Sequence, residues 1–307
     1  MTEKRGNGWW AACVLAAALA GGIATAQAQI LVGQTAGFTG PVADGVKETT
    51  AGARLYIDAV NARGGVLGQK VELISLDDKF DPALTVENAR KLIEERNVSA
   101  LFLTRGTPNT EAVVPLLDKY GIALVGPSTG AMSLHQPVRR HVFNVRAPYQ
   151  REAEKAIGYL ASLGVSRLAI VQTDDSFGAD VLIGVQKGLQ AAKLTPVAHE
   201  KFDRAKPDFS IIAPRIALAN PQAVIMIASS AATVQGYNAL RAAGSTAQVV
   251  TFSHNASSGF VKNLGSNARG VIVTQVFPNE RATNLPMVRE AQELAKAQQQ
   301  EISSFAK

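Results

Sequence analysis

Short apolar segments alternate with longer amphipathic segments along most of the 307-residue chain. The apolar segments are near-continuous runs of Val, Ile, Leu and Ala, which is typical of strands buried on both faces. The longer segments repeat apolar residues at helical spacing, as Ala53, Ile57 and Val60 do, which predicts helices with one buried face. Strands are predicted at 30–34, 71–76, 100–103, 123–125, 167–172, 197–201, 223–227, 249–252 and 271–275. Helices are predicted at 49–61, 81–96, 109–119, 151–163, 178–194, 209–219 and 233–243.

The order of these elements predicts an α/β fold, because alternating strands and helices form parallel sheets covered by helices on both faces. A single core seldom grows beyond about 250–300 residues, and the series of elements starts again with the helix at 151–163. We therefore expect two similar lobes, each a doubly wound parallel sheet, with 142–149 as the first crossing between lobes and 274–278 as the return. The first lobe would comprise residues 29–147 plus 276–307, and the second lobe residues 148–275.

The first 28 residues have the pattern of a cleavable signal peptide. Lys4 and Arg5 form a short positive region, an apolar run follows, and small residues at Ala26 and Ala28 match the positions that a signal peptidase reads. The apolar run is too short for a membrane anchor, which needs about 20 residues. Cys13 lies inside this run, which argues against a lipid anchor. We expect cleavage after Ala28 and export to the periplasm.

Charge and composition exclude several classes of protein. The formal net charge of +6 is spread along the chain, whereas nucleic-acid binding requires a focused basic face, so no nucleic acid partner is expected. The only cysteine precedes the expected cleavage point, so the exported chain would lack thiols, which suits an oxidising compartment. The four histidines lack zinc-site spacing, and neither glycine-rich nucleotide motif occurs, so we expect no metal and no cofactor.

Hydroxyl-bearing and small residues collect where the predicted strands end. In a parallel sheet, ligands bind beyond the carboxyl ends of the strands, where helix N-termini present free N–H groups. Such side chains suit hydrogen bonding to a small polar solute and do little as acids, bases or metal ligands. These loops are 104–110, 126–131, 174–178, 229–230 and 253–255.

An enzyme is the less favoured interpretation. The segment from Gly126 to Gly130 matches the G-x-S-x-G pattern of serine hydrolases, with Ser128 as the nucleophile, but Gln136-Pro137 soon interrupts any following helix. The pairs Asp77-Asp78 and Asp174-Asp175 could hold magnesium or act as paired carboxylates, yet aspartate after a strand is usually a turn former or a helix cap. A secreted serine hydrolase therefore stays only an alternative.

Six short motifs occur in one order along the chain, and together they resemble a known family. The chain is similar to the periplasmic solute-binding proteins of branched-chain amino-acid ABC importers, which have the type I periplasmic binding protein fold. The resemblance implies two lobes that close about a hinge on a small-molecule solute, an inner-membrane ABC permease as partner, and a monomer. The motifs are Gly40-Pro41, Gly64 to Gly68, Asp77 to Pro82, Gly106 to Thr110, Pro127 to Ala131 and Asp174 to Gly178.

The resemblance also implies roles for residues of these loops. Thr107 falls where the family uses a hydroxyl to hold the ligand carboxylate, Ser128 and Gly130 where it binds the same polar head, and Phe177 where an aromatic packs on the ligand. Helix capping is the alternative role for Thr107 and Ser128, and packing between the lobes is the alternative for Phe177. The neighbouring loop residues complete the candidate ligand-binding set, namely Asn109, Thr110, Thr129, Ser230 and Asn255.

Two departures from the family pattern shape the expected ligand and fold. Family members that bind α-amino acids place an acid near the position of His254-Asn255, so we expect a ligand without an α-ammonium, such as an organic acid or an amide. Arg105 could pair with an extra ligand carboxylate, but a solvated surface arginine is favoured. Family chains also continue further, so the first lobe is expected to be incomplete and the chain truncated at Lys307.

The favoured function is therefore a periplasmic receptor that delivers a small carboxylate-bearing solute, branched-chain amino-acid-like or another organic acid or amide, to a permease. A ligand-binding sensor or regulator of the same fold, docking on a signalling partner, is the alternative.

Overall fold

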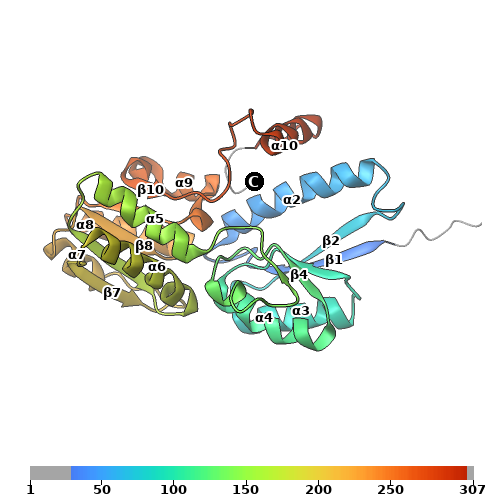
Figure 1. Ribbon diagram of the computed structural model, residues 1–307, viewed down its shortest axis with the longest axis horizontal. Helices are drawn as coiled ribbons and strands as arrows, with labels where there is room; N and C mark the ends of the chain where they lie inside the picture. Colours follow the sequence, from blue (N-terminus) through green and yellow to red (C-terminus); the bar gives the residue numbers. More distant parts are fainter. Residues whose placement is uncertain (1–28, 303–307) are drawn as a thin grey trace, which may run out of the picture.

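Buried apolar strands form two separate parallel sheets in the computed structural model, which describes residues 29–302. The predicted signal peptide, residues 1–28, lies outside the described residues. Figure 1 shows the two lobes lying side by side, each with helices on both faces of its sheet. The predicted fold class of two doubly wound α/β lobes is therefore confirmed.

In the first lobe the five strands lie in the order β2-β1-β3-β4-β5, and every pairing is parallel. Helix α2 covers one face of the sheet, and α3 and α4 cover the other (Figure 1). The strands are β1 (Ile30–Ala36), β2 (Val71–Asp77), β3 (Ala100–Phe102), β4 (Ala123–Val125) and β5 (Val142–Phe143). The helices are α2 (Ala43–Ala62), α3 (Pro82–Glu94) and α4 (Thr107–Tyr120).

The second lobe repeats this arrangement, with the order β10-β9-β8-β6-β7. Numbered within each lobe, both sheets read 2-1-3-4-5, so the two lobes have the same topology. The strands are β6 (Leu168–Thr173), β7 (Ala198–Phe202), β8 (Ala223–Ile227), β9 (Gln248–Thr251) and β10 (Val271–Val273). The helices are α5 (Tyr149–Ser162), α6 (Ser176–Ala192), α7 (Ile212–Leu218), α8 (Ser230–Ala242) and α9 (Ser258–Leu264).

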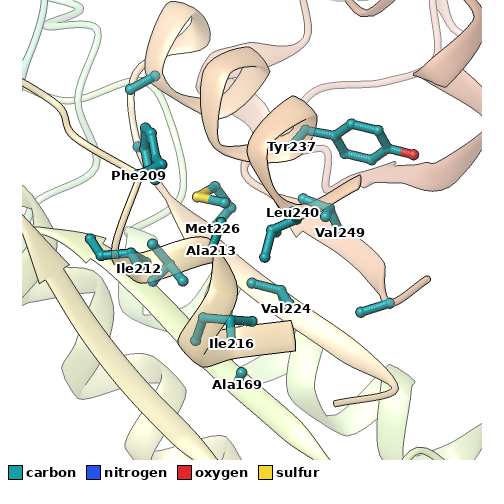
Figure 2. Close-up of a cluster of buried hydrophobic side chains, with 14 of the residues drawn as sticks. Ala169, Phe209, Ile212, Ala213, Ile216, Val224, Met226, Tyr237, Leu240 and Val249 are labelled. Carbon is teal, nitrogen blue, oxygen red and sulfur yellow. The ribbon is translucent and has the colours of Figure 1, made fainter. Parts of the chain in front are cut away.

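Strand β6 shows why the strands of the second lobe are apolar throughout. Successive side chains of a strand point to opposite faces of the sheet. Leu168 and Ile170 therefore enter the core formed with α5 and α6, while Ala169 and Val171 enter the core formed with α7, α8 and α9. Figure 2 shows this second core, with side chains of α7 and α8 packed on those of β6, β8 and β9. Both cores hold the sheet rigid, so its loops have defined positions.

Three elements were not predicted from the sequence. Strand β5 has only two residues and lies inside the segment expected to cross between lobes, and α9 is a short helix of seven residues. Helix α10 (Pro286–Ala297) packs on α2, and Gln298 donates a hydrogen bond to the Leu55 carbonyl at 3.0 Å. Val288 and Ala295 of α10 are buried, and Ala291 and Leu294 lie on the same stripe at helical spacing. Among the described helices none combines the length and apolar character needed to cross a membrane.

A buried ion pair fixes the geometry where the chain passes between the lobes. Arg146 Nη2 donates to Glu152 Oε2 at 2.8 Å, and both side chains are almost fully buried. Ser253 donates its backbone N–H to Glu152 Oε1 at 2.7 Å, and Thr274 donates its hydroxyl to the same oxygen. This hinge cluster (Arg146, Glu152, Ser253 and Thr274) therefore joins the first crossing, the start of α5, the loop after β9 and the segment after β10.

Glycines allow α5 and α6 to pack closely, and this generates a stability prediction. A Cβ at Gly184 would lie 2.2 Å from the Gln150 carbonyl oxygen, whereas a Cβ at Gly158, on α5, would meet nothing within 4 Å. We expect Gly184→Ala to lower the free energy of unfolding by about 2–3 kcal/mol, because the two backbones must move apart. Gly158→Ala should instead raise it by roughly 0.5–1 kcal/mol through helix propensity. Equilibrium urea unfolding of both variants checks this, and equal effects would contradict it.

Candidate functional site

The candidate site is a pocket between the two lobes, built from loops at the carboxyl ends of the strands. Its empty space, including the part open to solvent, is about 450 Å³. The order of strands reverses between β1 and β3 in the first sheet and between β6 and β8 in the second, and open parallel sheets bind ligands at such a point. The first lobe contributes Val42, Phe80, Arg105, Gly106, Thr107 and Ser128. The second lobe contributes Tyr149 at the start of α5, together with Thr173, Asp175, Phe177, Phe202, Arg204, Ser229 and His254.

Gly106 shapes the wall that the first lobe contributes. Its φ of 93° lies in the left-handed region, and a Cβ there would sit 2.7 Å from Phe80 Cε2. The Phe80 ring can therefore lie against the backbone only because the residue is glycine. Thr107 begins α4 directly afterwards, and its hydroxyl oxygen lies 2.6 Å from that of Thr129. The loop thus presents a ring, a helix N-terminus and a hydroxyl to the pocket.

The turn that carries Phe80 depends on the first aspartate pair. Asp77 accepts a hydrogen bond from the Lys79 N–H, and Asp78 accepts one from the Phe80 N–H at 2.9 Å. Lys79 and Phe80 both have positive φ, so these bonds hold a conformation that L-residues rarely adopt. Burial raises the pKa of the Asp78 carboxyl. The pair therefore forms a turn, as the sequence predicts.

Arg105 is buried in the pocket, which corrects the expectation of a solvated surface arginine. Only 6% of the residue is exposed. Its Nη1 donates to Ser128 Oγ at 3.1 Å, and its Nη2 donates to the His254 carbonyl oxygen at 2.7 Å in the other lobe. The expectation failed because Arg105 follows β3 in the middle of the sheet, where the second lobe covers it. Within residues 29–302, no aspartate or glutamate forms an ion pair with its guanidinium.

His254 is a neutral side chain on the pocket wall. Its Nε2 lies 2.9 Å from the Ala228 carbonyl, which can only accept, so Nε2 carries the proton and Nδ1 is an acceptor. Burial, and next the positive charge of Arg105, lower the pKa of His254 to about 3. The ring makes edge contacts with Phe177 at 5.0 Å and Tyr149 at 5.8 Å between centroids. Its Nδ1 has no hydrogen-bond partner among the described residues.

Arg204 closes the pocket at the end where Phe80 lies. It forms an ion pair with Asp175 at 3.1 Å within the second lobe. Its Nη2 donates to Asn109 Oδ1 of the first lobe at 2.5 Å, and its guanidinium carbon lies 3.8 Å from the centre of the Phe80 ring. We call these contacts the Arg204 bridge. Asp175 also caps α6 by accepting from the Gly178 N–H, so the bridge is anchored to a helix start.

Carboxylates of the first lobe make further contacts to the second lobe outside the pocket. Glu48 accepts hydrogen bonds from the N–H groups of Ser258 and Gly259 at the start of α9. Glu111 accepts one from the Ser176 hydroxyl at the start of α6. A negative charge near a helix N-terminus is stabilised by the unpaired N–H groups there. The lobes are therefore held closed from several sides.

The structure places the residues that the sequence singled out in two layers. Thr107, Ser128 and Phe177 line the pocket. The others lie behind the lining, where they hold the loops by backbone or side-chain contacts: Asn109, Thr110, Thr129, Gly130, Ser230 and Asn255. Asn255, for example, is fully buried and bonds to Ser230, Ala228 and Thr251.

Several lining residues escaped sequence reasoning. Phe80 lies in the Asp77 to Pro82 motif, which carries the family resemblance but gave no role to this residue. His254 attracted notice only because it stands where amino-acid-binding members of the family have an acid. Phe202 ends β7 and Arg204 follows it, in a charged stretch that carried no motif. Tyr149 begins α5 beside the first crossing. Only the meeting of the lobes shows that these side chains share a pocket.

The geometry around Ser128 does not form a hydrolase triad. Its Oγ accepts from Arg105, and no histidine ring of the described residues bonds to it. The residues after it form a single 3₁₀ turn, Met132–Leu134, instead of the helix that follows a nucleophile elbow. Residues 29–302 also hold no group of three His, Cys, Asp or Glu side chains that could bind a metal.

The family comparison agrees with this two-lobed fold. The sequence profile described as "Periplasmic binding protein" matches residues 29–306, so the chain belongs to this family. Among curated relatives, the Leu/Ile/Val-binding protein BraC3 of Rhizobium johnstonii is 28% identical over 195 residues, which cover 62% of this chain and 52% of that protein. The Leu/Ile/Val-binding protein homolog 3 of Brucella melitensis is 24% identical over 94% of this chain and 78% of its own.

Solved structures show the same fold. A substrate-binding periplasmic protein from Ralstonia solanacearum is 30% identical, with a TM-score of 0.83, over 91% of this chain and 80% of that one. The branched-chain amino acid binding protein LivJ from Streptococcus pneumoniae, solved in complex with isoleucine, is 19% identical with a TM-score of 0.80, over 91% and 80% of the two chains. This second likeness concerns the fold alone.

The Arg204 bridge yields a prediction about lobe closure. We expect Arg204→Gln to shift the lobes toward an open state by about tenfold, because a charge-assisted hydrogen bond contributes roughly 1.5 kcal/mol. Residues 29–302 contain no cysteine, so spin labels at Arg90→Cys and Ala191→Cys, both exposed and on opposite lobes, report the distance by electron paramagnetic resonance. Lys201→Gln is the matched control, since its ion pair with Asp174 is exposed and lies within one lobe. Identical distance distributions for the two variants would refute the bridge.

His254 gives a prediction about acid stability. The pKa of His254 in the folded state is about 3, below its ordinary value of 6.5. Between these two values the unfolded state binds a proton at His254 and the folded state does not. The stability contribution is therefore fully present above about pH 6.5 and declines as the pH falls toward 3. We expect His254→Gln to flatten this decline by up to about 1.4 kcal/mol per pH unit. Urea unfolding between pH 4 and 7 measures it, with His199→Gln, whose pKa burial also lowers, as the weaker comparison.

Proposed function

We propose that the protein is the periplasmic substrate-binding component of an ABC importer, capturing a small carboxylate-bearing solute between its lobes. The observation that carries this proposal is the buried Arg105 guanidinium, which lines the pocket without a carboxylate partner among the described residues. A buried unpaired charge is costly, and an anionic ligand would remove that cost.

The pocket offers a carboxylate several donors besides Arg105. Ser128 and Thr107 provide hydroxyls, and the first N–H groups of α4 lie beside them. Hydrogen bonds that involve an ionised group are stronger than neutral ones, and closure removes the water that competes for them. Binding of this kind needs no nucleophile or general base, which supports a role without catalysis.

The names of relatives support the same class of function. The Rhizobium and Brucella proteins are described as Leu/Ile/Val-binding, and the Streptococcus structure holds isoleucine as a transporter component. Delivery to an inner-membrane permease, export by cleavage after Ala28, and action as a monomer complete the proposal.

Replacing Arg105 tests the proposal directly. The purified protein is screened by thermal shift with small organic acids, their amides and branched-chain amino acids, and hits are measured by calorimetry. A ligand at about 100 times its Kd stabilises the fold by roughly 2.7 kcal/mol, which is readily seen. We expect Arg105→Gln to weaken binding of the best acid by about 10–100-fold, since a charged hydrogen-bond partner contributes roughly 1.5–3 kcal/mol.

Arg90→Gln is the matched control, because it removes the same charge from an exposed site on α3, away from the pocket. It should bind as the parent does. A cooperative melt with no shift by any small anion, or unchanged affinity in Arg105→Gln, would overturn the proposal.

A further inference from the structure

The charges that line the pocket give a sharper picture of its ligand. Among the described residues that line it, Arg105, Arg204 and Asp175 are the ionised side chains. Arg204 and Asp175 neutralise each other as an ion pair at 3.1 Å, and His254 is neutral. Arg105 is left as one uncompensated positive charge, so the pocket is complementary to a ligand of net charge −1.

The single carboxylate that lines the pocket is not free to receive an ammonium. Asp175 Oδ1 accepts the Gly178 N–H at 2.9 Å, and Oδ2 accepts Arg204 at 3.1 Å. An ammonium at Asp175 would have to compete with the Arg204 bridge and with the cap of α6. Glu152, a buried carboxylate beyond the lining, is engaged by Arg146, Ser253 and Thr274 in the hinge cluster.

Two of the aromatic rings that line the pocket already carry a cation on one face. The Phe80 ring already carries the Arg204 guanidinium at 3.8 Å, and the Tyr149 ring carries that of Arg146 at 4.3 Å. Cation–π attraction requires such a face, so two of the pocket rings are occupied on one side by arginine. An added ammonium would also lie near like charges, because Arg105 donates to the His254 backbone and Arg146 lies against Tyr149.

Apolar side chains from both lobes also line the pocket, beside the hydroxyl groups of Thr107, Ser128, Thr173 and Ser229. Val42 and Phe80 belong to the first lobe, and Phe177 and Phe202 to the second. Such walls favour an uncharged hydrocarbon body through burial of apolar surface.

From these observations we infer that the ligand is a monocarboxylate with an apolar body and no ammonium group, anchored by Arg105. This inference rests on the proposed function above and narrows it, because it excludes the α-amino acids that the relatives' names mention.

Matched ligand pairs test the inference, because each pair differs only in the amino group. Calorimetry on the purified protein compares leucine with isocaproate, and phenylalanine with hydrocinnamate. We expect the deaminated acid to bind at least tenfold more tightly in each pair. Isocaproamide should bind less tightly than isocaproate, because it lacks the charge that Arg105 requires.

The outcomes separate this inference from the proposed function. Leucine binding as tightly as isocaproate, or more tightly, would overturn the inference and leave the solute-binding proposal standing. If neither acids nor amino acids bind to a protein that melts cooperatively, both fail.

A variant pair at His254 supplies an independent check. His254→Glu introduces an acid beside the pocket, and we expect it to lower the preference for isocaproate over leucine by about tenfold. His254→Gln keeps the position neutral, and leucine should stay the weaker ligand. Equal preferences in the two variants would contradict the charge argument, and the wild-type ligand pairs decide the question should His254→Glu not fold.

Discussion

The buried pair of Arg146 and Glu152 sets the relation between the two lobes, and the pocket exists only through that relation. A buried charge must be paired and hydrogen-bonded, so each oxygen of Glu152 has defined donors, drawn from both crossings and from the loop after β9. The same loop carries His254 into the pocket one residue later. Holding Ser253 at the hinge therefore also positions the pocket wall, which couples the placement of the lobes to the shape of the binding site.

Arg105 contrasts with Arg146, although both are buried arginines at the ends of strands. Arg146 has its carboxylate inside the protein, whereas within residues 29–302 the side chain of Arg105 bonds only to a hydroxyl and a carbonyl, one from each lobe. Its bond to His254 spans the cleft, so closure itself buries the charge. A closed state that is strained by an unpaired cation gains stability when an anion enters, and this difference is what lets a ligand shift the equilibrium toward closure. The charge of Arg105 and the closure of the lobes are therefore energetically coupled.

The alternation of apolar strands and amphipathic helices was sufficient to predict both sheets, because a parallel sheet buries both faces and leaves a strong local pattern. Strand β5, with two residues, leaves little pattern, whereas α10 has apolar residues at helical spacing and lies beyond the last element that was predicted. For the site, local sequence indicated the loops of Thr107, Ser128 and Phe177. Arg105 was placed on the surface and Arg204 was not singled out, since their surroundings come from the opposite lobe. Contacts across a cleft depend on how the two lobes are oriented, and the local spacing of residues in the sequence does not determine that orientation.

The same separation explains why similarity in fold leaves the ligand open. The strand order and the two cores fix where each loop ends, and this framework is what a TM-score of 0.83 at 30% identity reflects. The charge of the pocket depends on very few side chains at the loop tips, Arg105, Asp175, Arg204 and His254. Substitutions there leave the packing of the sheets untouched, because none of these side chains belongs to the cores. A binding protein can therefore change the charge class of its solute while its lobes and hinge stay the same, and the ligand must be deduced from the pocket.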